Sequence, residues 1–223
     1  MRRMTMAQNC VLGATILCLT LAGGCAALNA TKTPPPAFYA LNNAGMPAPT
    51  AIPVSVASSP STLTLLVSPT HAASGVTSQR IIYLRDAHKL EYFAHSEWIE
   101  PPARMLAPLI VAALETGGGF RAVVTTPSVA AGDLRLDTEI IRLQHDFQTQ
   151  PSHVRFTLRA YLVEEKTRRV LDWREFDSVV PATSGNPYGG VVAANQAVQT
   201  ALEELAAFCR EVAFRAKSGS KAQ

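Results

Sequence analysis

The stretch that decides the fold covers residues 133–180 and reads DLRLDTEIIRLQHDFQTQPSHVRFTLRAYLVEEKTRRVLDWREFDSVV. Apolar and polar side chains alternate along it in three runs, which two short polar segments separate. Such alternation is typical of strands that have one buried face. In the first run the alternation shifts by one place at Ile140 and Ile141, which predicts a β-bulge. We therefore expect three long strands joined by tight turns.

Helices are predicted on both sides of this stretch. Residues 188–215 carry apolar side chains at helical spacing, which predicts a long C-terminal helix. Upstream, Pro101 and Pro102 open a second helix, which ends at the glycines of residues 117–119. Shorter strand-like runs lie at residues 63–67, 80–84, 89–93 and 120–124. This order predicts an α/β (α+β layered) domain, with a mixed, mostly antiparallel sheet of about five strands and flanking helices.

The first 24 residues are typical of an export signal, because Arg2 and Arg3 precede an apolar run that is too short to span a membrane. Residues 21–25 read LAGGC and look like a lipobox, the motif at which a lipoprotein signal peptidase cuts before a cysteine. We therefore predict a signal peptide at residues 1–24 and a lipid anchor on Cys25. The alternative is an ordinary signal peptide cut close to Cys25, which would leave a free thiol in an oxidising compartment.

Proline, alanine, threonine and serine dominate residues 25–60, which we interpret as a tether between the lipid and the folded domain. Within the tether, residues 38–41 are aromatic and apolar, which predicts a short edge strand docked on that domain. A single domain is predicted at residues 61–216, followed by a disordered tail at residues 217–223. Cys209 lies in the apolar stripe of the last helix, so we expect a buried thiol.

The sequence carries no enzyme signature, since it has no nucleophile elbow, no paired metal-ligand spacing and no phosphate loop. Its five histidines are scattered, and we interpret them as surface or turn residues. The formal net charge falls from +3 to +1 when the signal segment takes Arg2 and Arg3 with it, which does not indicate a nucleic-acid partner. We therefore expect a protein that is not an enzyme and has no metal or cofactor.

Aromatic residues gather where a strand runs into the first helix, at Tyr92, Phe93 and Trp98, with Met105 in the first turns of that helix. Tryptophan and tyrosine dominate the energetics of protein interfaces, so these four residues are the candidate partner-binding site. The alternative for Trp98 is that its side chain locks the helix onto the sheet.

Several short motifs, taken in order behind the lipobox, resemble the ABC-type transport auxiliary lipoprotein family, of the PqiC or YmbA type. They are YAL at residues 39–41, RIIYLR at 80–85, LEYF at 90–93, and Trp98 followed by PARML at 102–106. The resemblance covers residues 38–213. It implies a mixed sheet of five strands with flanking helices, similar to the N-terminal domain of TolB.

The resemblance also implies a non-enzymatic envelope component that works with an MCE-domain protein and, through it, with an ABC permease and an ATPase. The traffic of phospholipid or other apolar molecules between membranes is the implied process. Ala26 follows the cysteine instead of the aspartate that retains lipoproteins in the inner membrane, so we expect an outer-membrane lipoprotein that faces the periplasm. A direct lipid carrier, with an apolar cavity between the sheet and the last helix, is the alternative, and assembly into a homo-oligomer is left open.

Overall fold

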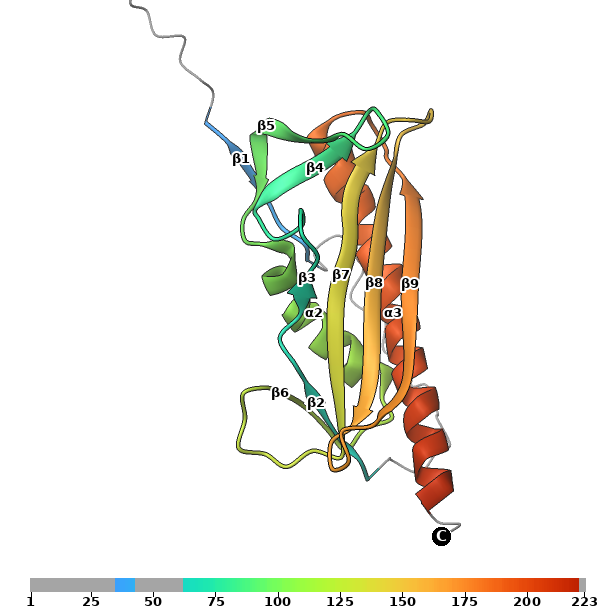
Figure 1. Cartoon of the computed structure of the whole chain (residues 1–223). Coiled ribbons are helices and arrows are strands. Elements are labelled where there is room, and N and C mark those ends of the chain that lie inside the picture. The colour runs from blue at the N-terminus through green and yellow to red at the C-terminus, as the bar shows by residue number, and fades with distance from the viewer. Residues whose placement is uncertain (1–34, 43–61, 221–223) are drawn as a thin grey trace, which may run out of the picture. The chain divides into compact units, whose positions relative to one another are not determined.

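A computed structural model describes residues 35–42 and 62–220, and the chain divides into two units at Pro35. The unit from Pro36 onward contains every strand and helix discussed below. In chain order these are β1 (Ala37–Tyr39), β2 (Thr64–Val67), β3 (His71–Ala72), β4 (Arg80–Leu84), β5 (Leu90–Trp98), α2 (Pro102–Gly117), β6 (Ala122–Thr125), β7 (Leu134–Asp146), β8 (His153–Glu164), β9 (Val170–Pro181) and α3 (Pro187–Ser220) (Figure 1).

All the described strands belong to one mixed sheet of nine strands. The path β1-β5-β4-β7-β2-β6 runs through it, β3 pairs with β7, and β8 lies between β7 and β9. The longest pairings, of β8 with β7 and with β9, are antiparallel, whereas β1–β5, β4–β7 and β2–β7 are parallel. The predicted fold class is confirmed. The sheet has more strands than the predicted total of about five, because the short runs that form β1 and β6 also join it. The sequence analysis missed β3, which is only two residues long.

The predicted bulge is present in β7. The pairing with β8 shifts its register between Ile140 and Arg142, so Ile141 has no partner across the ladder. The shift keeps Leu143 on the buried face, in line with Ile140, although three positions separate the two residues. A bulge therefore allows a long strand to keep one apolar face along its whole length.

α2 begins and ends, and α3 begins, where the sequence provides helix signals. Pro102 opens α2, and Gly118, with a positive φ of 66°, ends it, as predicted. At the start of α3 the side-chain oxygen of Asn186 accepts a hydrogen bond from the backbone N–H of Gly189 at 2.9 Å, which is the role of an N-cap. α3 packs mainly on β8 and β9, and α2 packs against α3.

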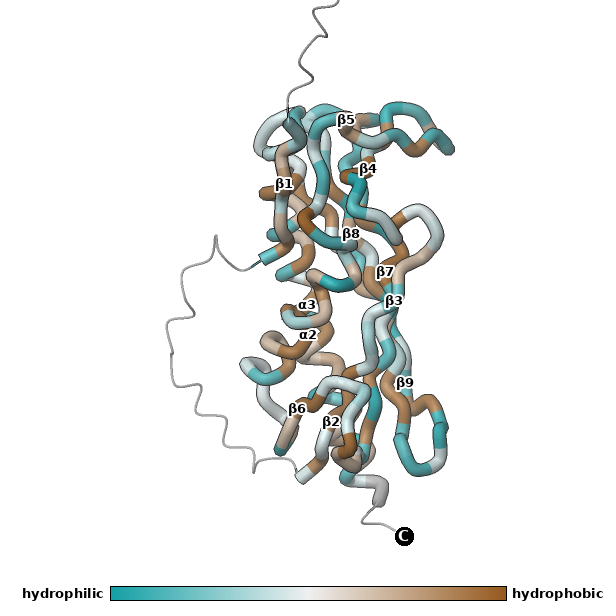
Figure 2. The backbone as a smooth tube through the Cα atoms, turned by 90° about the vertical axis from the view of Figure 1, so that its left-hand side faces the viewer, coloured by the Kyte–Doolittle hydropathy of each residue, from teal (hydrophilic) through white to brown (hydrophobic). Residues whose placement is uncertain are grey.

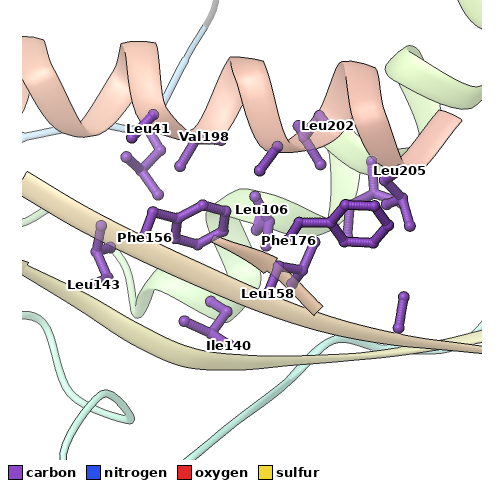
Figure 3. Close-up of a cluster of buried hydrophobic side chains, with 14 of the residues drawn as sticks. Leu41, Leu106, Ile140, Leu143, Phe156, Leu158, Phe176, Val198, Leu202 and Leu205 are labelled. Atoms are coloured by element: carbon purple, nitrogen blue, oxygen red, sulfur yellow. The ribbon is translucent and has the colours of Figure 1, made fainter. Parts of the chain in front are cut away.

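The core lies between α3 and the long strands (Figure 3). Phe156 and Leu158 of β8, Phe176 of β9, and Leu205 and Phe208 of α3 are almost completely buried. Phe176 and Phe208 meet edge to face, with ring centroids 5.9 Å apart. Cys209 is buried beside them, as predicted, and burial raises the pKa of its thiol to about 12. Close packing of this kind is where most of the stability of a domain arises.

Two predicted boundaries are wrong. The folded unit starts at Pro36 instead of residue 61, because the predicted edge strand at residues 38–41 is present as β1 and Leu41 is buried in the core. The last helix continues to Ser220, so residues 217–220 of the predicted disordered tail are helical. The predicted signal peptide, Cys25 and the remainder of the tether lie outside the described residues.

Among the described residues, we find no helix with the length and apolar character needed to cross a membrane.

Candidate partner-binding site

The four predicted partner-binding residues differ sharply in exposure. Tyr92 is 52% exposed and Phe93 is half-buried, whereas Trp98 and Met105 are only 3% and 6% exposed. A side chain that the core already covers is not available to a partner protein. The prediction is therefore wrong for Trp98 and Met105, and Tyr92 is the exposed member of the set.

Trp98 and Met105 instead join three elements of the fold. The backbone N–H of Trp98 donates to the carbonyl of Gln79 at 2.7 Å, and Trp98 pairs with Tyr39 of β1. Met105 of α2 accepts a hydrogen bond from the backbone N–H of Leu41 through its sulfur, at 3.4 Å. The side chain of Trp98 belongs to the buried core, which agrees with the alternative interpretation of this residue as a lock between helix and sheet.

A second contact fixes the N-terminal segment to α3. The side chain of Asn195 donates to the carbonyl of Ala40 at 3.2 Å and accepts from the backbone N–H of Asn42 at 2.8 Å. One amide side chain thus satisfies two backbone groups of a segment that lies about 150 positions away in the sequence. Asn195 explains why a short strand such as β1 keeps its place beside β5.

The β4–β5 hairpin rests on a cluster of aromatic rings. Tyr83 of β4 lies 4.6 Å from Phe93 of β5 and 5.8 Å from Phe147, measured between ring centroids. His145 lies 4.1 Å from Phe147, and β4 pairs with β7 at this level. Because these rings fill the space between the hairpin and the end of β7, they hold the hairpin in a defined position.

The outer side of this hairpin carries the exposed apolar groups. The guanidinium of Arg80 lies 4.1 Å from the ring centroid of Tyr92, and Leu90, two residues before Tyr92 on β5, is 56% exposed. We call Arg80, Leu90 and Tyr92 the hairpin surface. The β4–β5 hairpin that carries it lies at the same end of the sheet as β1 (Figure 2). An exposed aromatic ring beside an arginine is the composition that protein interfaces favour.

His145 is a functional candidate that the sequence analysis interpreted as a surface or turn residue, and this was wrong. Its side chain is only 2% exposed and its Nε2 lies 2.9 Å from the hydroxyl of Ser152. Its Nδ1 has no hydrogen-bond partner among residues 35–42 and 62–220. Burial, and secondarily the nearby His153, lower its pKa from 6.5 to about 4, although Asp146 acts in the opposite direction. The inward position of residue 145 in the alternation of β7 was the signal that could have found it.

Gly190 in the first turn of α3 makes room for this histidine. A Cβ at position 190 would lie 2.5 Å from Nδ1 of His145, so only glycine fits without a shift. The neighbouring cavity, lined by Ile81, Trp98 and His145 among others, has a volume of about 10 Å³. That is room for about one water molecule, and a catalytic cleft needs more space.

The outer face of β8 and β9 is covered by ion pairs. The Nε–H of Arg155 is shared between the two carboxylate oxygens of Asp177, at 2.9 and 3.1 Å, and its Nη2 donates to Oδ2 at 2.6 Å. Arg159 donates to Glu175 from Nε, at 2.9 Å. The guanidinium of Arg155, with the hydroxyl of Thr157, holds the pKa of Asp177 at about 2. These carboxylates are engaged in the sheet surface, and in the part of the chain that the structure describes no cluster of three metal-ligating side chains occurs.

The interface between the sheet and α3 contradicts the predicted lipid-carrier cavity. Phe156, Phe176 and Leu205 point into this space together with leucines of both layers (Figure 3), and each of the three is at most 1% exposed. An acyl chain would have to displace these side chains to enter. The packing therefore disfavours a carrier that encloses its ligand between these two layers.

Comparison with known proteins gives a family and a fold. A family model described as the ABC-type transport auxiliary lipoprotein component matches residues 45–206. A crystal structure of a Xanthomonas campestris protein assigned to the family model DUF330 is 23% identical, with a TM-score of 0.69, over 81% of this chain and 98% of that one. A Chlamydia trachomatis hypothetical protein is 7% identical, with a TM-score of 0.50, over 69% of this chain and 98% of that one.

None of the curated protein sequences matches the chain. At identities below 25% the two solved structures establish the fold alone. The family model covers well over half of the chain, with the hairpin surface and most of α3 inside its limits. The chain belongs to the family of ABC-type transport auxiliary lipoprotein components.

Proposed function

We propose that this protein is a non-enzymatic adaptor of an MCE-type ABC transport system, held by a lipid on Cys25 in the outer membrane and facing the periplasm. The MCE-domain protein would be its direct partner and would connect it to the ABC permease and ATPase. Lipids or other apolar molecules would be the cargo that the whole system moves. Membership of the transport auxiliary family supports the general role.

The hairpin surface is the observation that carries the adaptor proposal. Tyr92 and Leu90 are each more than half exposed, although Tyr83, Phe93 and Phe147 hold the hairpin beneath them in place. Exposed apolar side chains on a rigid base lose little conformational entropy when a partner covers them. The hairpin surface therefore fits a protein partner better than a substrate, since Arg80, Leu90 and Tyr92 combine apolar area with a cation and offer no nucleophile or general base.

Co-purification with the MCE-domain protein tests the proposal. Tyr92→Ala in the full lipidated chain should reduce the recovered partner at least about tenfold, because an interface aromatic that acts as a hot spot contributes about 2 kcal/mol or more. Trp173→Ala is the matched control, since Trp173 is a 56% exposed aromatic on β9. Recovery should stay at the parent level in this control. Equal recovery with the parent and Tyr92→Ala would contradict the assignment of the hairpin surface.

The lipid anchor needs a separate experiment. Cys25→Ser should abolish palmitate labelling of the chain in cells and release it from the outer-membrane fraction. A Cys209→Ser variant is the control, because Cys209 is buried in the core and is not available for acylation. Labelling that persists in Cys25→Ser would overturn the anchor at this residue.

A further inference from the structure

A second surface feature lies at the end of the sheet opposite the hairpin surface. A pocket of about 210 Å³ opens where β9 begins and α3 ends. The turn between β8 and β9 and the last turns of α3 lie together at this end (Figure 1). Six residues line the pocket, namely Arg169, Val170, Leu171, Val212, Arg215 and Ala216.

The two arginines of the pocket differ in what holds them. Arg215 donates a hydrogen bond to Asp172 at 2.7 Å, which positions its guanidinium and lowers the pKa of that carboxyl. Glu211 lies 4.0 Å from the same guanidinium. Arg169 has no carboxylate within 4.0 Å among the residues that the structure describes. The pocket therefore contains one positioned cation and one whose charge no ion pair offsets.

The acidic side chains near the turn are already engaged elsewhere. Glu165 pairs with Arg135 and Arg168, at 3.2 and 3.3 Å, and Glu164 accepts a hydrogen bond from the hydroxyl of Thr167. None of these acids is therefore free to neutralise Arg169. An anion from outside the chain would therefore meet the guanidinium of Arg169, with which no carboxylate of the described residues forms an ion pair, beside the Arg215–Asp172 pair.

The rest of the pocket is apolar. Val170 is 51% exposed although it is an aliphatic residue, whereas Val212 at the base of the pocket is buried. Leu171 and Ala216 are half-buried between them. Aliphatic side chains would not help to bind a small hydrated anion alone, because they cannot replace the hydrogen bonds that water makes to it.

We propose that this pocket binds the anionic head of an amphiphile, a phosphate or carboxylate group that carries an alkyl chain. The head would accept hydrogen bonds from the guanidinium groups of Arg169 and Arg215, and the first carbons of the chain would lie on Val170 and Val212. The volume is below the range of pockets that enclose a whole drug-sized ligand, so the remainder of the chain would stay outside. The inference is independent of the MCE partner and of the hairpin surface.

Calorimetric titration of the purified protein tests this directly, with decyl phosphate below its micelle concentration as the probe. Decyl phosphate should bind at least about tenfold more tightly than inorganic phosphate, which lacks the chain, and than decanol, which lacks the charge. The same titration with decanoate compares the affinity for a carboxylate head with the affinity for a phosphate head. Inorganic phosphate that binds as tightly as decyl phosphate would overturn the proposal in favour of a free anion site, and equal binding of decanol would overturn it in favour of a purely apolar one.

Variants locate the site. Arg169→Gln should weaken decyl phosphate binding about tenfold, because it removes charge-assisted hydrogen bonds without breaking an ion pair of the fold. Arg104→Gln, an equal change of charge at an exposed position of α2, should leave binding unchanged. Val170→Thr keeps the shape of the side chain. It should weaken the binding of decyl phosphate but not the binding of inorganic phosphate. Binding that Arg169→Gln and Arg104→Gln weaken equally, or that neither weakens, would overturn the assignment to this pocket.

Discussion

The half of the sheet beneath α3 and the end that carries the β4–β5 hairpin are built by different means. In the first half, β7 and β8 align over 12 residue pairs and come from neighbouring parts of the sequence. At the hairpin end, β1 and β5 share three pairs, and β4 and β7 share two, each between distant segments. The first half contributes fully buried rings such as Phe156 and Phe176 to the core, whereas the hairpin end leaves Tyr92 and Leu90 exposed. The comparison teaches that the core contacts that stabilise the domain and the exposed side chains of the proposed partner surface lie in separate parts of one sheet.

Removing a core ring should produce the largest effect and would test the first half of this comparison. Phe156→Ala should lower the free energy of unfolding by about 3–5 kcal/mol, because Phe156 is fully buried and its removal leaves a cavity. Tyr92→Ala at the hairpin end should lower it by less than about 1 kcal/mol. Equilibrium urea denaturation measures both values. Similar losses in the two variants would break the comparison.

Lowering the pH should reduce the stability of the fold through His145, which lies where the long strands meet the hairpin end. Its pKa in the folded chain is about 4, below the value of 6.5 in the unfolded chain, so the unfolded chain binds more protons between these values. The stability that buried, neutral His145 contributes is therefore fully present above pH 6.5 and is lost as the pH falls toward 4. This loss amounts to at most about 3 kcal/mol. The corresponding loss from Asp177 begins only below pH 3.8.

Unfolding midpoints measured from pH 7 to pH 4 would check this prediction. In His145→Gln the dependence of stability on pH across this window should become flatter, whatever the absolute stability of the variant. An unchanged slope would mean that other groups titrate there.

A smaller loss is expected when the space around His145 is filled. Gly190→Ala should cost about 1–3 kcal/mol, because the added Cβ would lie 2.5 Å from Nδ1 of His145 and the packed ring has little room to move. Gly185→Ala is the control, since its Cβ would meet Phe147 at an ordinary 3.6 Å. Thermal unfolding of both variants would sharpen the comparison. If the two glycines tolerated alanine equally, the junction would be looser than the structure indicates.

The smallest change concerns the attachment of the N-terminal segment to α3. Asn195→Ala should cost about 1–2 kcal/mol, because two hydrogen bonds to Ala40 and Asn42 are lost. Amide exchange of Leu41 and Asn42 should become faster, with little change in β8. Gln196→Ala, an exposed neighbour on the same helix, should leave both rates unchanged. Unchanged exchange in Asn195→Ala would show that Met105 and Trp98 hold the segment without it.

Much of the fold follows from local patterns, and the site follows from them only in part. The bulge at Ile141, the end of α2 at Gly118 and the short strand before Leu41 were all predicted correctly. Trp98 was included in the candidate partner-binding site beside its interpretation as a lock between helix and sheet, because aromatic residues are favoured both in cores and at interfaces. His145 was misjudged because histidine is less often fully buried than an aliphatic residue. The residue type was given more weight than the inward position of residue 145 on β7.

The sequence by itself determined the strands, the helices and their apolar faces, because periodicity reports which side of an element avoids water. It also determined the motifs that resemble the transport auxiliary family, which the family model confirmed. Only the tertiary structure decided that β1 pairs with β5, that Trp98 is covered while Tyr92 is not, and that Arg169 and Arg215 share one pocket. The physical reason is that such contacts join segments far apart in the chain, and no local pattern states which element will pack against which.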